Sequence, residues 1–289
     1  MNSLLQISVV IPVYNDTEGL ILTLKSLKQQ SLPSHAFEVI VANDGGSPEI
    51  ESVCYDFDVR CVNIVPNQGS YFARNRGVEQ ARAHSFAFVD ADITVPPQWL
   101  TNGLSALEYA HYVAGDIEIE KSKVKQLADL YEFYTAFDIK KYIKQYHFGV
   151  TANLFVRKEV FNHVGFFEER LRSSGDLEFG DRVYAANSFK QVHEPSIRVL
   201  HPPRGYAKYK SKIKRGCVGQ VKLKRLYPDR FPAIVPNMFK AMVKMILPPN
   251  PLKAKYLRSG EKKQLQLFFF GWYINFLKGY YTAKAILAA

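Results

Sequence analysis

Hydrophobic residues in the first 90 positions gather in four short runs, and polar or turn-forming residues separate each run from the next. The runs cover residues 7–13, 37–42, 59–65 and 85–89. They are rich in β-branched and aromatic residues and are bounded by Asn, Asp, Gly and Pro, a pattern typical of buried strands. The sequence therefore predicts four strands in this part of the chain.

Helical spacing fills the gaps between these runs. Leu20, Leu24 and Leu27 recur on one face of a helix that Asp16 or Thr17 can cap. Residues 68–83 predict a second helix. Because strands alternate with helices, the sequence predicts crossover units and an α/β fold with a mainly parallel sheet.

Size and composition are those of a folded protein. The 289 residues, 47% hydrophobic and 22% charged, suffice for one elaborated α/β domain, with or without a tail, and exclude a disordered chain. Cys54, Cys61 and Cys217 have no Cys-x-x-Cys spacing, which favours reduced thiols in a cytoplasmic protein over disulfides or a zinc site. The first residues lack the features of a signal peptide, so none is expected.

Charge divides the chain near residue 203. Residues 204–289 carry 19 Lys and Arg against Asp229 and Glu261, whereas residues 1–203 carry 19 basic and 25 acidic residues. A basic C-terminal third suits an anionic partner such as lipid head groups, a diphosphate or nucleic acid. No nucleic-acid motif accompanies it, so we expect no nucleic acid as a partner.

Polar side chains follow three of the predicted strands, at residues 14–16, at residues 43–44, and at Asp90 and Asp92. In parallel sheets, ligands bind at the carboxyl ends of the strands. One residue separates Asp90 from Asp92, so both carboxylates lie on one side of an extended backbone. Such oxygen ligands suit Mg²⁺ or Mn²⁺ held together with substrate phosphates, although a solvated acidic turn is the alternative.

Residues 9–15, 43–47, 67–77 and 89–92, in this order, resemble the signatures of family 2 glycosyltransferases of the GT-A fold. The resemblance covers residues 5–205. It implies a Rossmann-like, mainly parallel sheet in a catalytic domain of residues 1–203, with a nucleotide-binding half (1–95) and an acceptor half (96–203). A basic, helical C-terminal extension of residues 204–289 would follow. Asn43 stands where the family usually has an acid, which leaves Asp44 as the single acid there.

The resemblance also implies roles for the residues of the donor side. The implied roles are Pro12 and Tyr14 lining the base and ribose pocket, Asp44 accepting a hydrogen bond from the base, Arg74 contacting the base or a phosphate, Asp90 binding ribose or metal, and Asp92 holding the divalent ion. For two of these residues the sequence leaves an alternative open: Tyr14 could be a packed core aromatic, and Arg74 a surface helix residue.

The acceptor side resembles the same family at residues 151–157, 165–169 and 175–182. There an acid six residues before an Arg serves as general base, which implies that role for Asp176, six residues before Arg182. Asn153, Glu168 and Arg182 are the expected acceptor-side residues. A helix N-cap is the alternative for Asp176.

His201 follows a late strand and, by resemblance, is expected to be a third metal ligand, which would favour Mn²⁺ over Mg²⁺. His193 is a weaker candidate. For each histidine, a structural role is the alternative.

The C-terminal third contains three segments of interest. Residues 204–225 form a basic helix that could cover the donor diphosphate, face a membrane or simply be solvated. Residues 238–247 are amphipathic. The apolar run 265–277 is shorter than the roughly 20 residues that span a bilayer. It predicts a helix that lies in the membrane interface at the cytoplasmic face. The alternative is a helix docked on the catalytic domain or on a second subunit.

Together these features predict an inverting glycosyltransferase that moves a sugar from a nucleotide-diphosphate donor, expected to be a UDP-sugar, to a hydroxyl of a glycan or lipid-linked acceptor. The Gln-x-x-Arg-Trp motif of processive synthases is absent, so one sugar is expected per encounter. A nucleotidyltransferase that makes sugar nucleotides would begin with a glycine-rich phosphate loop that carries Arg or Lys. Residues 13–17 contain neither Gly nor a basic residue, which disfavours this class of enzyme. The sequence also leaves open a non-catalytic basic binding protein and a dinucleotide oxidoreductase, although the oxidoreductase would need a glycine motif that is absent after the first strand.

Overall fold

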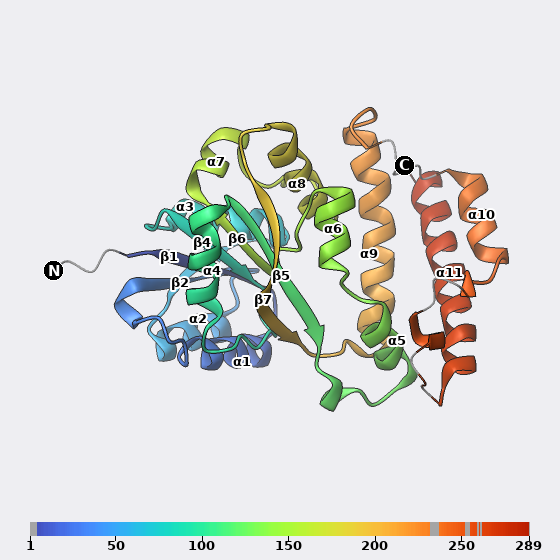
Figure 1. The fold of residues 1–289 in the computed structure, drawn as a ribbon, viewed down its shortest axis with the longest axis horizontal. Coiled ribbons are helices and arrows are strands. Elements are labelled where there is room, and N and C mark those ends of the chain that lie inside the picture. Colours follow the sequence, from blue (N-terminus) through green and yellow to red (C-terminus); the bar gives the residue numbers. More distant parts are fainter. Residues whose placement is uncertain (1–4, 232–236, 252–254, 259, 261, 289) are drawn as a thin grey trace. The chain divides into compact units, whose positions relative to one another are not determined.

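The computed structural model describes residues 5–231, 237–251, 255–258, 260 and 262–288. They form two compact units (Figure 1). The sheet unit consists of the residues up to Glu118, Phe137–Arg170 and Gly175–His201; the helical unit consists of Ile119–Ala136, Leu171–Ser174 and the residues from Pro202 onward. The division near residue 203 expected from charge therefore lies next to a structural boundary. Residues 119–136, however, belong with the C-terminal helices and not with the expected acceptor half.

A seven-stranded sheet with the order β3-β2-β1-β4-β6-β5-β7 forms the centre of the sheet unit. β1 pairs in parallel with β2 and β4, and β2 with β3, while β6 pairs antiparallel with β4 and β5. The sheet is therefore mixed but mostly parallel, as predicted. The strands are β1 Ile7–Val13, β2 Phe37–Asp44, β3 Arg60–Ile64, β4 Ser85–Val89, β5 Tyr112–Ile119, β6 Asn153–Arg157 and β7 Gln191–His201.

The helices of the sheet unit are α1 Thr17–Leu27, α2 Pro48–Phe57, α3 Ser70–Gln80, α4 Trp99–Tyr109, α6 Ile139–Tyr146, α7 Lys158–Val164 and α8 Gly175–Ala185, with a 3₁₀ turn, η1, at Ser34–Ala36. The helix after the first strand begins as predicted, because the Asp16 carboxylate accepts a hydrogen bond from the N–H of Gly19 at 3.0 Å. α3 ends at Gln80, three residues earlier than expected.

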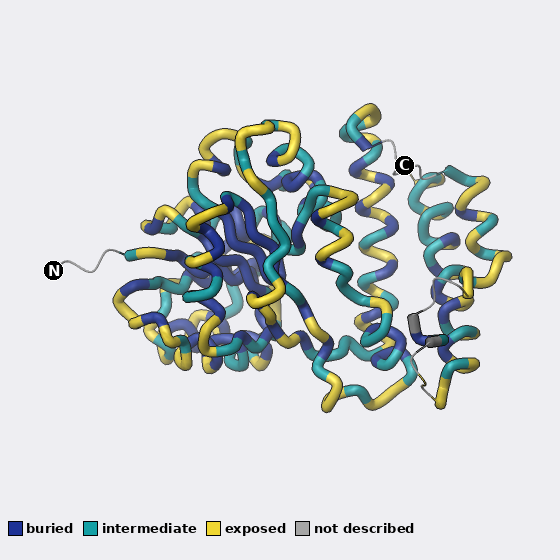
Figure 2. The backbone as a smooth tube through the Cα atoms, viewed as in Figure 1, coloured by how far each residue is buried: buried dark blue, intermediate teal, exposed yellow. Residues whose placement is uncertain are grey.

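Close packing of α3 on the sheet fixes where its side chains point. A Cβ at Gly77 would lie 2.4 Å from Cγ1 of Val10 in β1, so only glycine permits this approach. On β4, Phe88 packs against Phe161 and Phe167, with ring centroids 5.9 and 5.4 Å away. Figure 2 shows the strands as the most deeply buried part of this unit.

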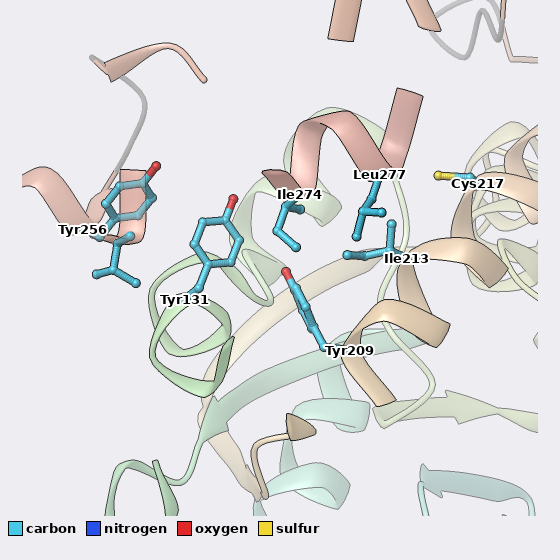
Figure 3. Close-up of a cluster of buried hydrophobic side chains, with 8 residues drawn as sticks. Tyr131, Tyr209, Ile213, Cys217, Tyr256, Ile274 and Leu277 are labelled. Atoms are coloured by element: carbon cyan, nitrogen blue, oxygen red, sulfur yellow. The ribbon is translucent and has the colours of Figure 1, made fainter. Parts of the chain in front are cut away.

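The helical unit contains α5 Leu127–Thr135, α9 Gly205–Leu226, α10 Met238–Ile246 and α11 Gln264–Leu287, with short 3₁₀ turns η2 Lys121–Lys123 and η4 Lys255–Arg258. Its core includes Tyr131 of α5, Tyr209 and Ile213 of α9, and Ile274 and Leu277 of α11 (Figure 3). In the described part of the chain, no helix is both long enough and apolar enough to cross a membrane.

A buried carboxylate links α5 to the basic helix α9. Glu132 is buried and pairs with Arg204 at 2.5 Å and with Lys212 at 3.2 Å. Although burial raises the pKa of Glu132, these two cations outweigh it and hold the pKa below its usual value. Burial also lowers the pKa of Lys212 to about 8. Lys212 is therefore engaged with α5, while Lys208, Lys214 and Arg215 on the same helix are exposed.

Candidate active site

Three parallel strands, β1, β2 and β4, end at one edge of the sheet, and each delivers a predicted site residue there. Tyr14 follows β1, Asp44 ends β2 and Asp90 follows β4. The expectation that these residues share one edge of the sheet is therefore confirmed.

Asp44 is buried and holds the loop that leads into α3. Its carboxylate accepts hydrogen bonds from the backbone N–H groups of Gln68 and Gly69 and from the side chain of Asn67, each at 2.7 Å. Asn43 stabilises the preceding turn by donating to the carbonyl of Ser47 at 2.9 Å. The structure thus gives Asp44 a loop-organising role beside the base contact expected from the sequence.

Tyr14 is an exposed aromatic ring at the end of β1. It is 57% exposed, so the alternative of a packed core residue is wrong. One edge of the ring rests against Gly45, where a Cβ would lie 2.9 Å from the ring. More than half of the surface of Tyr14 is thus exposed to solvent. Pro12, in contrast, is buried within β1 opposite Ala42.

Arg74 and Asp90 form a close ion pair. The Nη2 atom of Arg74 lies 2.5 Å from Oδ1 of Asp90, and the Arg74 side chain is almost fully buried. The alternative of a surface helix residue is therefore wrong for Arg74. Its Nε atom is buried and has no hydrogen-bond partner among the residues that the structure describes. A buried donor of this kind is costly unless a ligand satisfies it.

Asp176 lies in the first turn of α8, next to this ion pair. Thr151 donates a hydrogen bond to Oδ1 of Asp176 at 2.9 Å, and the backbone N–H of Asp176 donates to the Tyr71 hydroxyl at 3.3 Å. α8 begins at Gly175, so Asp176 is a residue of the first turn and the alternative of an N-cap is wrong.

The charge state of Asp176 depends on its surroundings. Burial raises the pKa of Asp176 to about 6, while the Arg74 guanidinium and the Thr151 hydroxyl lower it and Asp90 raises it. A carboxyl group with a pKa near neutrality can both accept and release a proton at physiological pH. This is the property that a general base requires.

Asp92 and His201 face each other where β7 meets the segment after β4. Thr94 and Leu200 form an antiparallel bridge with two backbone hydrogen bonds of 2.9 Å, which brings their neighbours together. Nε2 of His201 lies 3.9 Å from Oδ1 of Asp92, and His201 is buried. The hydroxyl of Thr23 accepts the N–H of Asp92, whose φ of +139° is a strained conformation for a residue with a side chain.

A carboxylate beside an imidazole fits Mn²⁺ or Mg²⁺, because such ions take oxygen ligands and Mn²⁺ also accepts nitrogen. In the described ranges, no three His, Cys, Asp or Glu side chains converge as metal ligands. Of the predicted metal-binding residues, Asp92 and His201 thus lie together, whereas Asp90 pairs with Arg74.

Two other predicted residues stabilise the strands. Asn153 is fully buried: it accepts a hydrogen bond from the Trp99 indole at 2.9 Å and donates to the carbonyls of Asp116 and Ile197 at 2.8 and 3.1 Å. His193 pairs with the Asp116 carboxylate at 2.7 Å. The structure thus places Asn153 inside the sheet and His193 within hydrogen-bond distance of Asp116.

The remaining acceptor-side candidates form local ion pairs. Arg182 pairs with Glu178 at 2.8 Å and donates to the carbonyl of Phe166 at 2.6 Å, so it ties α8 to the loop after α7. Glu168 pairs with Arg170 at 2.6 Å. These contacts hold the loop between α7 and α8.

Comparison with known proteins identifies the family. The profile described as "Glycosyl transferase family 2" matches residues 8–165. Glycosyltransferase AglE of Haloferax volcanii is 31% identical over 225 residues, which span 75% of this chain and 73% of AglE. The chain belongs to glycosyltransferase family 2. This glycosyltransferase is therefore an enzyme, and the nucleotidyltransferase, oxidoreductase and non-catalytic alternatives no longer apply.

Solved structures confirm the GT-A fold of this glycosyltransferase. It is similar to the mannosyltransferase PcManGT from Pyrobaculum calidifontis in complex with GDP-Man and Mn²⁺, with a TM-score of 0.64 and 16% identity over 98% of this chain and 86% of that one. It is also similar to residues 1–349 of S. aureus TarS in complex with UDP-GlcNAc, with a TM-score of 0.58 and 14% identity over 98% and 92% of the two chains.

Proposed function

We propose that this glycosyltransferase transfers a sugar from a nucleotide-diphosphate donor to a hydroxyl of a glycan or lipid-linked acceptor, with Asp176 as general base. The observation that carries the proposal is the cluster at the sheet edge. Asp176, with its pKa of about 6, lies beside the Arg74–Asp90 pair, and all three side chains belong to the sheet unit. The GDP-Man and UDP-GlcNAc complexes of similar folds support a sugar nucleotide as donor; a UDP-sugar is the donor we expect.

The donor nucleotide would lie across the ends of β1 and β2. The exposed ring of Tyr14 offers a face on which a base can stack. Asp44 fixes the loop at residues 67–69 and, in our proposal, also contacts the base. The buried Nε atom of Arg74 provides an unused donor for a base, ribose or phosphate oxygen.

Asp92 and His201 would hold Mn²⁺ or Mg²⁺ together with the donor diphosphate. When bound, such an ion supplies Lewis-acid neutralisation of the negative charge that develops on the leaving diphosphate. The Mn²⁺ in the PcManGT complex supports a divalent cation at this type of site.

Asp176 would accept the proton of the acceptor hydroxyl as its oxygen attacks the anomeric carbon. The new C–O bond forms while the bond to the diphosphate breaks, so one displacement inverts the configuration and an α-linked donor gives a β-linked product. The Arg74 guanidinium and the Thr151 hydroxyl favour the ionised form of Asp176 before attack. Because the Gln-x-x-Arg-Trp motif is absent, we propose transfer of one sugar per encounter.

The test is a thermal-shift panel of UDP- and GDP-sugars, with and without Mn²⁺. One donor should raise the melting temperature in a Mn²⁺-dependent manner, because a ligand that binds the folded state stabilises it by mass action. Asp92→Ala should abolish the Mn²⁺-dependent part of the shift. Asp181→Asn, an acid-to-amide change elsewhere on α8, is the control and should retain it. A panel without any shift, or an unchanged shift in Asp92→Ala, would contradict the donor and metal assignments.

A further inference from the structure

One face of α11 carries a row of large apolar side chains that remain exposed in the described part of the chain. Its members recur every three or four residues, so they lie on one face of the helix. They are 36–73% exposed, and they are Leu265, Phe269, Trp272, Phe276 and Tyr280. The opposite face, with Leu267, Ile274 and Leu277, is buried in the core of the helical unit. The exposed row is therefore not needed to pack α11.

The helix α10 adds a second exposed row, formed by Phe239, Met242 and Ile246. The two rows adjoin, because the indole N–H of Trp272 donates to the carbonyl of Ile246 at 3.1 Å. The helices also pack closely, since a Cβ at Gly279 would lie 2.4 Å from a backbone oxygen of α10. Single exposed apolar residues are ordinary on proteins, but adjoining rows of this size mark an interaction surface. Figure 2 shows exposed positions along both helices.

The charges around these rows are of one sign. Residues 230–289 contain ten Lys and Arg and a single acid, Glu261. The lysines on α10 and around α11 are exposed at positions 240, 244, 262, 263 and 284. Two copies of this face would bring like charges together, which disfavours self-association. An apolar, aromatic face with a lysine rim matches the interface of a bilayer that contains anionic lipid.

We propose that the exposed face of α10 and α11 binds the surface of an anionic membrane, with both helices lying in the plane of the interface. The aromatic and aliphatic rows enter the boundary between head groups and acyl chains, while the lysines contact the anionic head groups. The proposal concerns only the helical unit and does not depend on which donor or acceptor the sheet unit uses.

The test is co-sedimentation of the full-length protein with vesicles of phosphatidylcholine alone or with added phosphatidylglycerol. The protein should bind the phosphatidylglycerol vesicles, and binding should weaken in high salt. Phe269→Ser with Phe276→Ser should reduce partitioning about ten-fold or more, because each removes an exposed ring from the interface. Lys240→Glu with Lys244→Glu should do so on anionic vesicles only, since each lysine near such a surface is worth about a five-fold change in binding.

Tyr55→Ser, which removes an 87% exposed ring from the sheet unit, is the matched control and should bind like wild type. Donor-dependent thermal shifts measured on every variant show whether the sheet unit is intact, so loss of the membrane site and failure of the proposed enzymatic function are distinguishable. Absence of binding to anionic vesicles, or equal binding by the serine pair and the control, would overturn the proposal. If light scattering shows dimers that disappear in the Phe269→Ser, Phe276→Ser double variant, the exposed face of α10 and α11 would instead bind a second copy of the chain.

Discussion

At the scale of single residues, burial, the Arg74 guanidinium and the hydroxyl of Thr151 together shift the pKa of Asp176, the carboxyl group that we propose as base. The Thr151 hydrogen bond of 2.9 Å favours the ionised form of Asp176, while burial opposes ionisation and raises the pKa to about 6. Transfer should therefore decline as the pH falls through about 6, because the base becomes protonated.

Thr151→Val should move this acidic limb to higher pH, because it removes a hydrogen bond that lowers the pKa of Asp176. At about pH 5.5 the variant should be several-fold slower than wild type, on the order of the change in ionised fraction, and at about pH 8.5 the two rates should approach each other. The measurement is kcat/KM against pH for both proteins. A limb at the same pH in both would show that this hydroxyl does not tune the base.

The sequence located the acids but not their partners. Asp44 and Asp90 could be predicted because apolar strands precede them and parallel strands end together. The contacts of Asp176 with Tyr71 and Thr151 could not, since they join residues 105 and 25 positions apart. Both partners lie inside recognised segments, at residues 67–77 and 151–157. Only the tertiary structure shows that the Thr151 hydroxyl contacts the carboxylate of Asp176 and the Tyr71 hydroxyl its backbone N–H.

At the scale of elements, the start of α3 and the start of α8 meet through Tyr71 and Gly175. A Cβ at Gly175 would lie 2.6 Å from the Tyr71 ring. The tyrosine ring therefore occupies the space that a side chain at position 175 would need.

Gly175→Ala should therefore displace the Tyr71 ring or Asp176. We expect a loss of about 1–3 kcal/mol in the free energy of unfolding, the usual consequence of overpacking, and a lower kcat. The control is Gly216→Ala on α9, where a Cβ would contact nothing within 4 Å. That change should stabilise the protein slightly, because alanine favours a helix by up to about 1 kcal/mol over glycine. Denaturant unfolding and initial rates test both; similar behaviour of the two variants would contradict the close contact.

Helix lengths were predicted less well than strand positions. The first four strands follow β-branched runs and were predicted to within two residues, whereas β5 and β6 were not predicted. α2 was not predicted, because Ile50, Val53 and Cys54 are its only buried residues and give a weak pattern. α11 extends to Leu287, ten residues beyond the predicted apolar run, and Gly279 lies within it. Packing against α10 carries the helix past this glycine, and the sequence alone does not reveal that contact.

At the scale of the whole molecule, the chain combines a mildly acidic sheet unit with a basic helical unit. The charge division predicted this near residue 203, but residues 119–136 join the helical unit through long-range contacts that composition cannot show. Glu132, for example, pairs with Arg204, 72 residues away. The two units carry separate proposals, transfer at the sheet edge and lipid binding on α10 and α11, so each can fail without the other.

The most direct test of the central claim measures donor binding and sugar transfer side by side in Asp176→Asn. We predict an unchanged, Mn²⁺-dependent thermal shift with the donor and a loss of about 10²–10⁴ in transfer rate, the usual contribution of a positioned base. Transfer at the wild-type rate would contradict the assignment of Asp176 as the general base.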